Sequence, residues 1–231
     1  MANQKATRGS SLRIFLAGAT GVIGVRLLPL MLAEGHVVAA MTRTPEKIDG
    51  LRTAGATPVL CDVLDRKSVT AAVEVFRPDV IVHQVTNLPD EIGKLAEFLA
   101  SNSRVRTEGT RNLLAAAQAV NALGFIAQSI AWGDGEAHEN AVVAAGGTVL
   151  RYGRLYGPGT YYENDLPPAP RIHIDEAARR TMPFLAGPSG IFVITDATSF
   201  DGVDIRKNAL HVLMSVRRRG VCRAYSDLSL T

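Results

Sequence analysis

The chain has 231 residues, of which 47% are hydrophobic and 20% charged, as in an ordinary soluble globular protein. This length fits one α/β domain, or a domain with a small appendage. The two cysteines, Cys61 and Cys222, are far apart and lack metal-ligand spacing, so neither a disulfide framework nor a zinc site is implied. The net charge of +3 suits an anionic ligand but does not by itself indicate nucleic-acid binding.

No apolar run in the sequence is long enough to span a bilayer as a helix, and residues 1–11 lack the apolar core of a signal peptide. We therefore expect a cytoplasmic protein that has a small-molecule substrate and neither a nucleic-acid nor a membrane partner. Residues 1–11 are read as a flexible tail, residues 12–160 as a dinucleotide-binding domain, and residues 161–231 as a small substrate-side lobe with a C-terminal tail.

Three glycines, Gly18, Gly21 and Gly24, lie between a short apolar run at 13–17 and a run with helical apolar spacing at 22–34. We expect Gly18 to permit the turn out of the strand, Gly21 to let a phosphate approach the backbone, and Gly24 to let the helix pack tightly on the sheet. The amino end of the helix would then face a pyrophosphate.

The glycine spacing is G-x-x-G-x-x-G, one residue wider at the first gap than the common dinucleotide fingerprint. A strand-to-helix turn that binds nothing is the alternative. The residues predicted to form the phosphate-binding turn are Gly18, Thr20, Gly21, Val22, Ile23 and Gly24.

Apolar strand patterns and amphipathic helix patterns alternate along the chain. After the first helix, strands are expected at 36–42, 57–61, 79–83, 124–129, 148–151 and 190–194, and helices at 46–54, 66–76, 92–122, 137–145 and 175–185. This order predicts a doubly wound, mainly parallel α/β sheet of the Rossmann type, with the cofactor across the carboxyl ends of the strands.

The second strand ends where a dinucleotide fold places its ribose-recognition residue, and here the chain has Thr42 and Arg43 in place of an acidic residue. An acid would bind the ribose hydroxyls and repel a 2′-phosphate, whereas a guanidinium matches phosphate geometry. The pattern favours NADP over NAD as the cofactor. A solvated loop arginine is the alternative.

Three separated motifs resemble the extended short-chain dehydrogenase/reductase family, the NAD(P)-dependent epimerase/dehydratase group. They are Gly18-Ala-Thr-Gly-Val-Ile-Gly24, Arg151-Tyr-Gly-Arg-Leu-Tyr-Gly-Pro-Gly159 and Ile172-His-Ile-Asp-Glu-Ala-Ala178. The resemblance implies adenine contacts from Asp62 and Val63, and cofactor contacts from Gln84, Val85 and Tyr152. It also implies that Ser129 hydrogen-bonds the reacting oxygen, and that the helices at 92–122 pair in a homodimer.

The chain departs from the family at the catalytic helix. The family uses a Tyr and a Lys four residues apart, and no tyrosine of this chain has a lysine at that spacing. The crossover at 130–147 is also short. Any relocated proton donor could be His138, Tyr161 or Tyr162. Arg106 stands where the family helix has Asn, and Asp175 is expected to cap the helix that follows it.

Two functions remain open at this point. The first is an NAD(P)-dependent oxidoreductase or epimerase/dehydratase-like enzyme that exchanges a hydride with a small carbonyl, alcohol or sugar nucleotide, with Ser129 polarising the substrate oxygen. The second is a non-catalytic dinucleotide-binding sensor or scaffold, which the absent Tyr/Lys pair favours. The fold alone does not separate them.

Overall fold

A computed structural model describes residues 11–132 and 137–197. The chain divides into two compact units, the first ending at Phe125 and the second beginning at Ile126, and each is described by itself. The predicted boundary between a cofactor domain at 12–160 and a substrate-side lobe stays a prediction. Residues 1–10 of the predicted flexible tail, and residues 198–231 of the predicted lobe and C-terminal tail with Cys222, lie outside the described residues.

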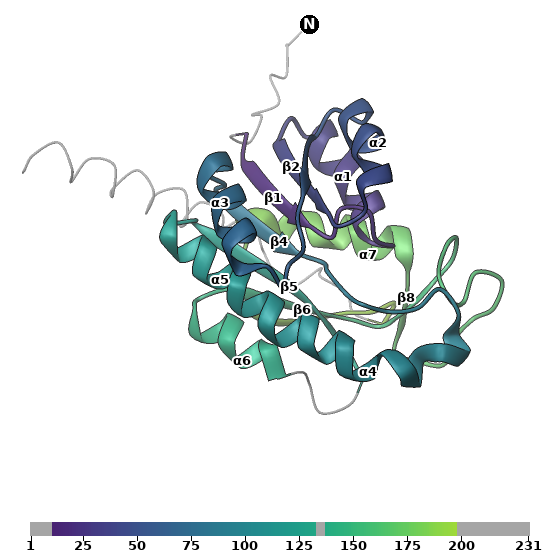
Figure 1. Ribbon diagram of the computed structural model, residues 1–231. Helices are drawn as coiled ribbons and strands as arrows, with labels where there is room; N and C mark the ends of the chain where they lie inside the picture. Colours follow the sequence, from purple (N-terminus) through teal and green to yellow (C-terminus); the bar gives the residue numbers. More distant parts are fainter. Residues whose placement is uncertain (1–10, 133–136, 198–231) are drawn as a thin grey trace, which may run out of the picture. The chain divides into compact units, whose positions relative to one another are not determined.

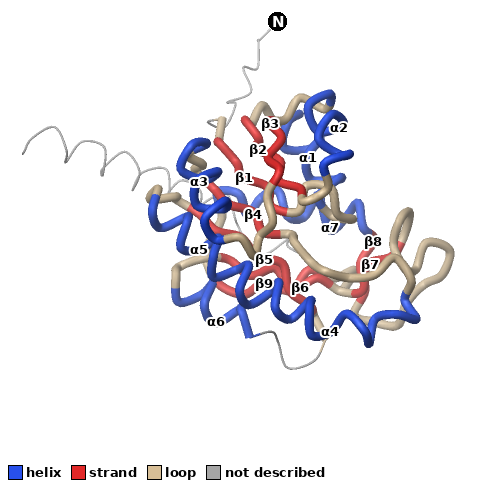
Figure 2. The backbone as a smooth tube through the Cα atoms, in the orientation of Figure 1, coloured by secondary structure: helices blue, strands red, loops and turns tan. Residues whose placement is uncertain are grey.

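The first unit is built on a parallel sheet in which the strands lie in the order β3-β2-β1-β4. Figures 1 and 2 show these strands side by side with their crossover helices. The strands are β1 (Arg13–Ala17), β2 (Val37–Thr42), β3 (Thr57–Leu60) and β4 (Val80–His83); the helices between them are α1 (Gly24–Ala33), the 3₁₀ turn Pro45–Lys47 with α2 (Ile48–Thr53), and α3 (Arg66–Phe76).

The centre of this unit is β1, because it pairs with β2 on one side and β4 on the other. Its residues Ile14 to Ala17 are completely buried, as expected for a parallel strand that is covered on both faces. Asp65 caps α3, since its carboxylate accepts the Ser68 backbone N–H at 3.1 Å and the Ser68 hydroxyl at 2.6 Å.

The long helix predicted at 92–122 is interrupted. It consists of a 3₁₀ turn (Ile92–Lys94), α4 (Leu95–Arg104), a π-helical turn (Val105–Gly109) and α5 (Thr110–Ala119). A Cβ at Gly109 would lie 2.9 Å from a methyl carbon of Val63, so the glycine lets the π turn approach the end of β3. Asn112 on α5 donates to the Val63 carbonyl at 3.0 Å.

The second unit has the parallel strand order β5-β6-β9. The strands are β5 (Gly124–Ile130), whose first two residues belong to the first unit, β6 (Thr148–Tyr152) and β9 (Gly190–Ile194). The helix α6 (Ala137–Ala144) connects β5 to β6. A separate parallel pair, β7 (Arg154–Tyr156) with β8 (Arg171–His173), was not predicted.

One capping assignment was wrong. The helix α7 (Ile174–Thr181), which continues into the 3₁₀ turn Met182–Ala186, is capped by His173. The His173 Nδ1 atom accepts the Asp175 backbone N–H at 3.3 Å. Asp175 itself lies within the first turn, where a carboxylate still complements the helix dipole.

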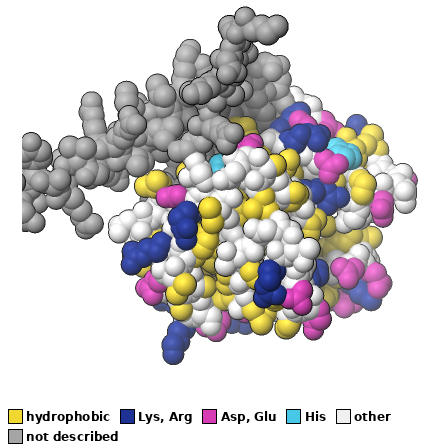
Figure 3. All heavy atoms as spheres, turned by 90° about the horizontal axis from the view of Figure 1, so that it is seen from above, with side chains coloured by type: hydrophobic (Ala, Val, Ile, Leu, Met, Phe, Trp, Pro, Cys, Tyr) yellow, Lys and Arg dark blue, Asp and Glu magenta, His cyan; other side chains and the backbone are white. Residues whose placement is uncertain are grey.

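The parallel pairing and crossover helices of both units confirm the predicted doubly wound, mainly parallel α/β class. No helix in the described ranges 11–132 and 137–197 combines the length and apolar character needed to cross a membrane. On the face that Figure 3 shows, basic and acidic side chains are interspersed among hydrophobic ones.

Candidate functional site

The turn between β1 and α1 has the backbone geometry that its glycines predict. Gly18 has φ +86°, and a Cβ there would lie 2.8 Å from the Gln84 carbonyl carbon. A Cβ at Gly24 would overlap the Gly18 carbonyl oxygen and the Ala19 backbone. Gly18 therefore serves the turn as predicted, while Gly24 allows the start of the helix to close on the turn.

Gly21 differs from its two neighbours because the space beside it is open. It is exposed, and a Cβ added there would have the Gly18 carbonyl oxygen, at 3.5 Å, as its nearest neighbour. The helix that follows has Ile23 at its N-cap, with no capping side chain and no acidic residue in its first turn. Uncapped backbone amides at a positive dipole end bind anions. This cradle therefore fits a pyrophosphate.

Hydrogen bonds join the turn to the end of β2. The Ala19 N–H donates to the Met41 carbonyl at 3.1 Å, and the hydroxyl oxygens of Thr20 and Thr42 are 3.0 Å apart. Arg43 follows as an exposed residue, and its Nη2 donates to Asn87 Oδ1 at 2.8 Å. Thr20 and Arg43 are therefore brought to the same edge of the sheet.

Asp62 and Val63 follow β3, the neighbour of β2. Asp62 is exposed, and its Oδ1 accepts the Leu64 N–H at 2.9 Å; Val63 is buried beneath the π turn. Asp62 thus shapes the local turn while one side of its carboxylate faces solvent.

Gln84 and Val85 leave β4 directly beside the glycine turn. The Gln84 N–H donates to the Ala17 carbonyl at 2.9 Å, and the backbone of both residues packs against Gly18. The Val85 N–H donates to His83 Nδ1 at 3.3 Å, and His83 is buried. The first unit therefore gathers the predicted phosphate-turn residues, Arg43, Gln84 and Val85.

Ser129 lies in the second unit and is part of a buried cluster that sequence reasoning missed. Its hydroxyl donates to Glu139 Oε1 at 2.5 Å, and Arg151 binds the same carboxylate through Nε at 2.9 Å and Nη2 at 2.5 Å. Ser129 is paired with Arg151 in the register of β5 and β6, and Glu139 projects from α6. The three side chains meet because two strands and one helix present them together.

The cluster is electrostatically balanced. The Glu139 side chain is only 4% exposed and that of Arg151 is 28% exposed, so the desolvated carboxylate depends on its guanidinium partner. The hydrogen bond from Arg151 to Glu139 raises the pKa of the guanidinium further above its usual range. Because the Ser129 proton is donated to Glu139, the serine oxygen presents its lone pairs elsewhere.

Four other predicted residues also lie in the second unit. Tyr152 is buried, with its hydroxyl 2.6 Å from Thr181 Oγ1 on α7. His138 is buried, with Nε2 3.0 Å from the Gln128 carbonyl. Tyr161 and Tyr162 are half-buried in the loop between β7 and β8. Their predicted roles remain predictions.

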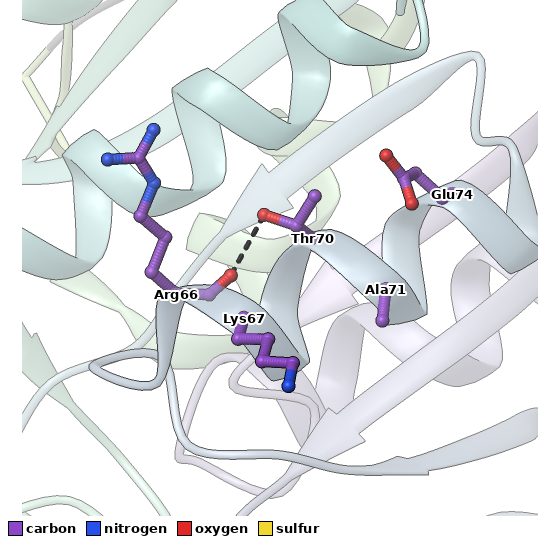
Figure 4. Close-up of a pocket in the computed structure, with 5 residues that line it drawn as sticks. All are labelled: Arg66, Lys67, Thr70, Ala71 and Glu74. Carbon is purple, nitrogen blue, oxygen red and sulfur yellow. Dashed lines mark hydrogen bonds between the residues drawn. The ribbon is translucent and has the colours of Figure 1, made fainter.

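A shallow hollow on α3 is a separate feature. Figure 4 shows that its lining residues all come from this one helix: Arg66, Lys67, Thr70, Ala71 and Glu74. The Thr70 hydroxyl donates to the Arg66 carbonyl at 2.8 Å. We assign this hollow no ligand. Within the described ranges, no group of three His, Cys, Asp or Glu side chains could hold a metal ion.

The fold and the glycine turn together define a dinucleotide-binding α/β protein. A family model described as NAD(P)H-binding matches residues 18–147, and the chain belongs to this family. The match begins at the first glycine of the turn and ends just before β6, so a nicotinamide dinucleotide is the cofactor class.

Curated relatives include a reductase and a dehydrogenase. A 3-diazoavenalumate denitrifying reductase from a Streptomyces species is 38% identical over 193 residues, covering 70% of this chain and 62% of that protein. A 3-beta-hydroxysteroid dehydrogenase from Mycolicibacterium neoaurum is 24% identical over 217 residues, covering 90% and 56%. The chain thus spans less than two thirds of the length of either relative.

Solved structures show the same fold. The UDP-Glc/GlcNAc 4-epimerase from Campylobacter jejuni superposes with a TM-score of 0.68 at 17% identity, covering 90% of this chain and 83% of that one. The UDP-glucose 4-epimerase from Thermus thermophilus, solved with NAD, has a TM-score of 0.64 at 18% identity and covers 89% and 83%. Together with the family match and the dehydrogenase relative, this shared fold confirms the resemblance to the extended short-chain dehydrogenase/reductase family.

Proposed function

We propose that this protein is an NADP-dependent enzyme that exchanges a hydride with a small carbonyl, alcohol or sugar-nucleotide substrate. The observation that carries the proposal is the open space at Gly21 in front of an uncapped helix. Relatives named as a reductase and a dehydrogenase support hydride transfer, and the epimerase structures share the fold that would hold the cofactor.

The residues of the first unit divide the work of binding. The turn from Gly18 to Gly24 would hold the pyrophosphate, Asp62 and Val63 the adenine, and the segment at 84–85 would pass along the cofactor. When bound, the nicotinamide supplies or accepts the hydride.

Arg43 is the basis for NADP rather than NAD. It follows Thr42 at the end of β2, is exposed, and donates one hydrogen bond to Asn87. A guanidinium has five N–H donors in a planar fork, so Arg43 retains donors for a 2′-phosphate. The missing acidic residue at this position removes the repulsion that an NAD-specific site exerts on that phosphate.

On the substrate side, we propose that Ser129 contacts the reacting oxygen. With its proton donated to Glu139, Ser129 accepts a hydrogen bond from a substrate hydroxyl. Donation to a substrate carbonyl requires the serine hydroxyl to turn away from the carboxylate. Glu139 and Arg151 therefore set which way the Ser129 hydroxyl points.

We also propose a homodimer formed through α4 and α5. The helix α4 has no buried residue, and Leu99 on it is 64% exposed, so its surface is available to a second copy of the chain. The expectation is a dimer by light scattering that dissociates in Leu99→Arg. A monomeric parent protein would exclude it.

Calorimetric titration with NADPH, NADP, NADH and NAD tests the cofactor, and a hydride-transfer screen against small carbonyls and sugar nucleotides tests the reaction. Gly21→Asp places a carboxylate at the cradle and should abolish binding while leaving the fold intact. Arg43→Ala should weaken NADPH about tenfold or more and NADH little. Unchanged NADPH affinity in Gly21→Asp would overturn the phosphate-turn assignment.

A further inference from the structure

Asn87 connects the arginine at the ribose end of the site to helix α4. It lies in the segment that follows β4, and its Oδ1 accepts Arg43 Nη2 at 2.8 Å. Its Nδ2 donates to Ser101 Oγ at 2.8 Å, and its backbone N–H donates to Asn102 Oδ1 at 2.9 Å. Asn87 thus has one polar contact toward β2 and two toward α4.

The hydrogen bonds of Ser101 determine which way the Asn87 amide faces. The Ser101 hydroxyl donates to the Phe98 carbonyl at 3.0 Å, so its oxygen accepts from the neighbouring amide. Only the NH₂ group of Asn87 can donate there. The amide oxygen of Asn87 must then face Arg43, which is the orientation that a guanidinium needs.

We infer that Asn87 is a positioning residue for NADP selectivity, and that it acts by holding the Arg43 guanidinium at the ribose end. The inference rests on the proposed role of Arg43 in binding the 2′-phosphate. A neutral partner suits this role because it orients the arginine without neutralising it. No described carboxylate lies within ion-pair distance of Arg43.

Holding the guanidinium matters because a free arginine side chain loses much conformational freedom when it binds. Asn87 orders Arg43 before the ligand arrives, and that ordering lowers the entropic cost of contacting a phosphate. NADH has no 2′-phosphate, so its affinity does not depend on this ordering. Selectivity between the two cofactors therefore depends on Asn87 as well as on Arg43.

The contacts with α4 add a second consequence. Since α4 has no buried residue, its contacts with Asn87 are a polar connection between the helix and the cofactor edge of the sheet. A ligand that fixes Arg43 also fixes Asn87, and through Ser101 and Asn102 it reduces opening of α4. NADPH should therefore slow amide exchange in α4 more than NADH does.

The test is calorimetric titration of the full chain and its variants with NADPH and NADH, with adenosine 2′,5′-bisphosphate and 5′-AMP as smaller probes. Asn87→Ala should lower the affinity for NADPH and for the bisphosphate about five- to tenfold, and it should leave the affinity for NADH and for 5′-AMP unchanged. Asn87→Asp keeps the shape but adds a charge that pairs with Arg43 and repels phosphate, so it should weaken NADPH further. Melting curves establish that both variants fold.

Asn112→Ala is the matched control, because it removes the same amide group from the contact with the Val63 carbonyl. It should change NADPH and NADH affinity by the same factor. An Asn87→Ala variant that binds NADPH as well as the parent, binds it more tightly, or loses both cofactors equally would overturn the inference.

Arg43→Ala separates this inference from the proposed function. If Arg43→Ala weakens NADPH alone while Asn87→Ala has no effect, NADP binding through Arg43 stands and the role of Asn87 falls. If Arg43→Ala leaves NADPH affinity unchanged, both fall together. Loss of the difference in α4 amide exchange between NADPH and NADH in Asn87→Ala would support the connection through Ser101 and Asn102.

Discussion

Alanine at Gly18 and at Gly21 should have opposite effects, although both residues belong to one short turn. Gly18 has φ +86°, which costs a residue with a side chain about 1–2 kcal/mol. A Cβ there would also lie 2.8–2.9 Å from three backbone atoms of Gln84 and Val85, and overpacking of this kind costs about 1–3 kcal/mol. Gly18→Ala should therefore lower the free energy of unfolding by about 3 kcal/mol and the melting temperature by about 6–12 °C relative to the parent protein.

At Gly21 the same methyl group would meet only ordinary contact, with its nearest neighbour at 3.5 Å. Replacing glycine there restricts the unfolded chain and stabilises by about 0.4–1 kcal/mol. Gly21→Ala should therefore melt at or slightly above the parent temperature, yet weaken NADPH about tenfold because the methyl group occupies the phosphate approach. Calorimetric melting and ligand titration measure both effects.

The result that would refute this reasoning is a Gly21→Ala protein that melts as low as Gly18→Ala. The space beside Gly21 would then be filled by the protein itself. Full NADPH affinity in a stable Gly21→Ala protein would instead show that no phosphate approaches the turn at this residue.

Burial raises the pKa of the Cys61 thiol to about 11, and the negative charges of Asp65 and Asp62 add to this rise. In a Cys222→Ser variant, Cys61 should therefore resist a disulfide reagent at pH 8 until the protein unfolds. Rapid labelling of the folded protein would contradict this. Glu176 has a lowered pKa because Arg180, and to a lesser extent Arg179, donates hydrogen bonds to its carboxylate. The ionised carboxylate therefore stabilises the folded state at any pH above an ordinary carboxyl pKa, and this contribution is lost as the pH falls through the lowered pKa. Urea unfolding of Glu176→Gln should show less stability at pH 7 and a weaker acid dependence, and unchanged curves would exclude the effect. In the same assay, Glu139→Gln should lower the free energy of unfolding by about 1–3 kcal/mol, because a neutral amide cannot replace the buried carboxylate as the partner of Arg151. A variant as stable as the parent protein would contradict this.

The elements of the first unit could be predicted because their signals are local. The apolar run at 13–17 coincides with β1, and the period at 66–76 coincides with α3. Glycine spacing identified the turn, since a positive φ and close backbone approach leave few other residues acceptable at Gly18. The steric role of Gly24 was predicted less well, because its contact is with the turn rather than with the sheet.

Features that depend on contacts between distant residues were not predictable. The helix at 92–122 has a continuous helical pattern, but a π turn at Val105–Gly109 accommodates its packing against Val63. The pair β7 and β8 consists of three-residue strands, too short for an alternating pattern to emerge. The cap is His173 rather than Asp175 because the helix begins at Ile174, two residues before the start that an Asp175 cap predicts.

The cluster around Ser129 shows why the surroundings of the proposed catalytic residue could not be predicted from residue spacing alone. Its members come from three elements, and their meeting depends on strand register and on the face that α6 presents. In the related family, a lysine charge lowers the pKa of a tyrosine one helical turn away. The corresponding helix of this chain, α6, instead carries the carboxylate of Glu139. The guanidinium of Arg151 is bound to both oxygens of that carboxylate. A positive charge engaged in this way is not available to acidify a phenol, so the proton transfer that we propose would use Ser129 or a group other than a tyrosine activated from α6.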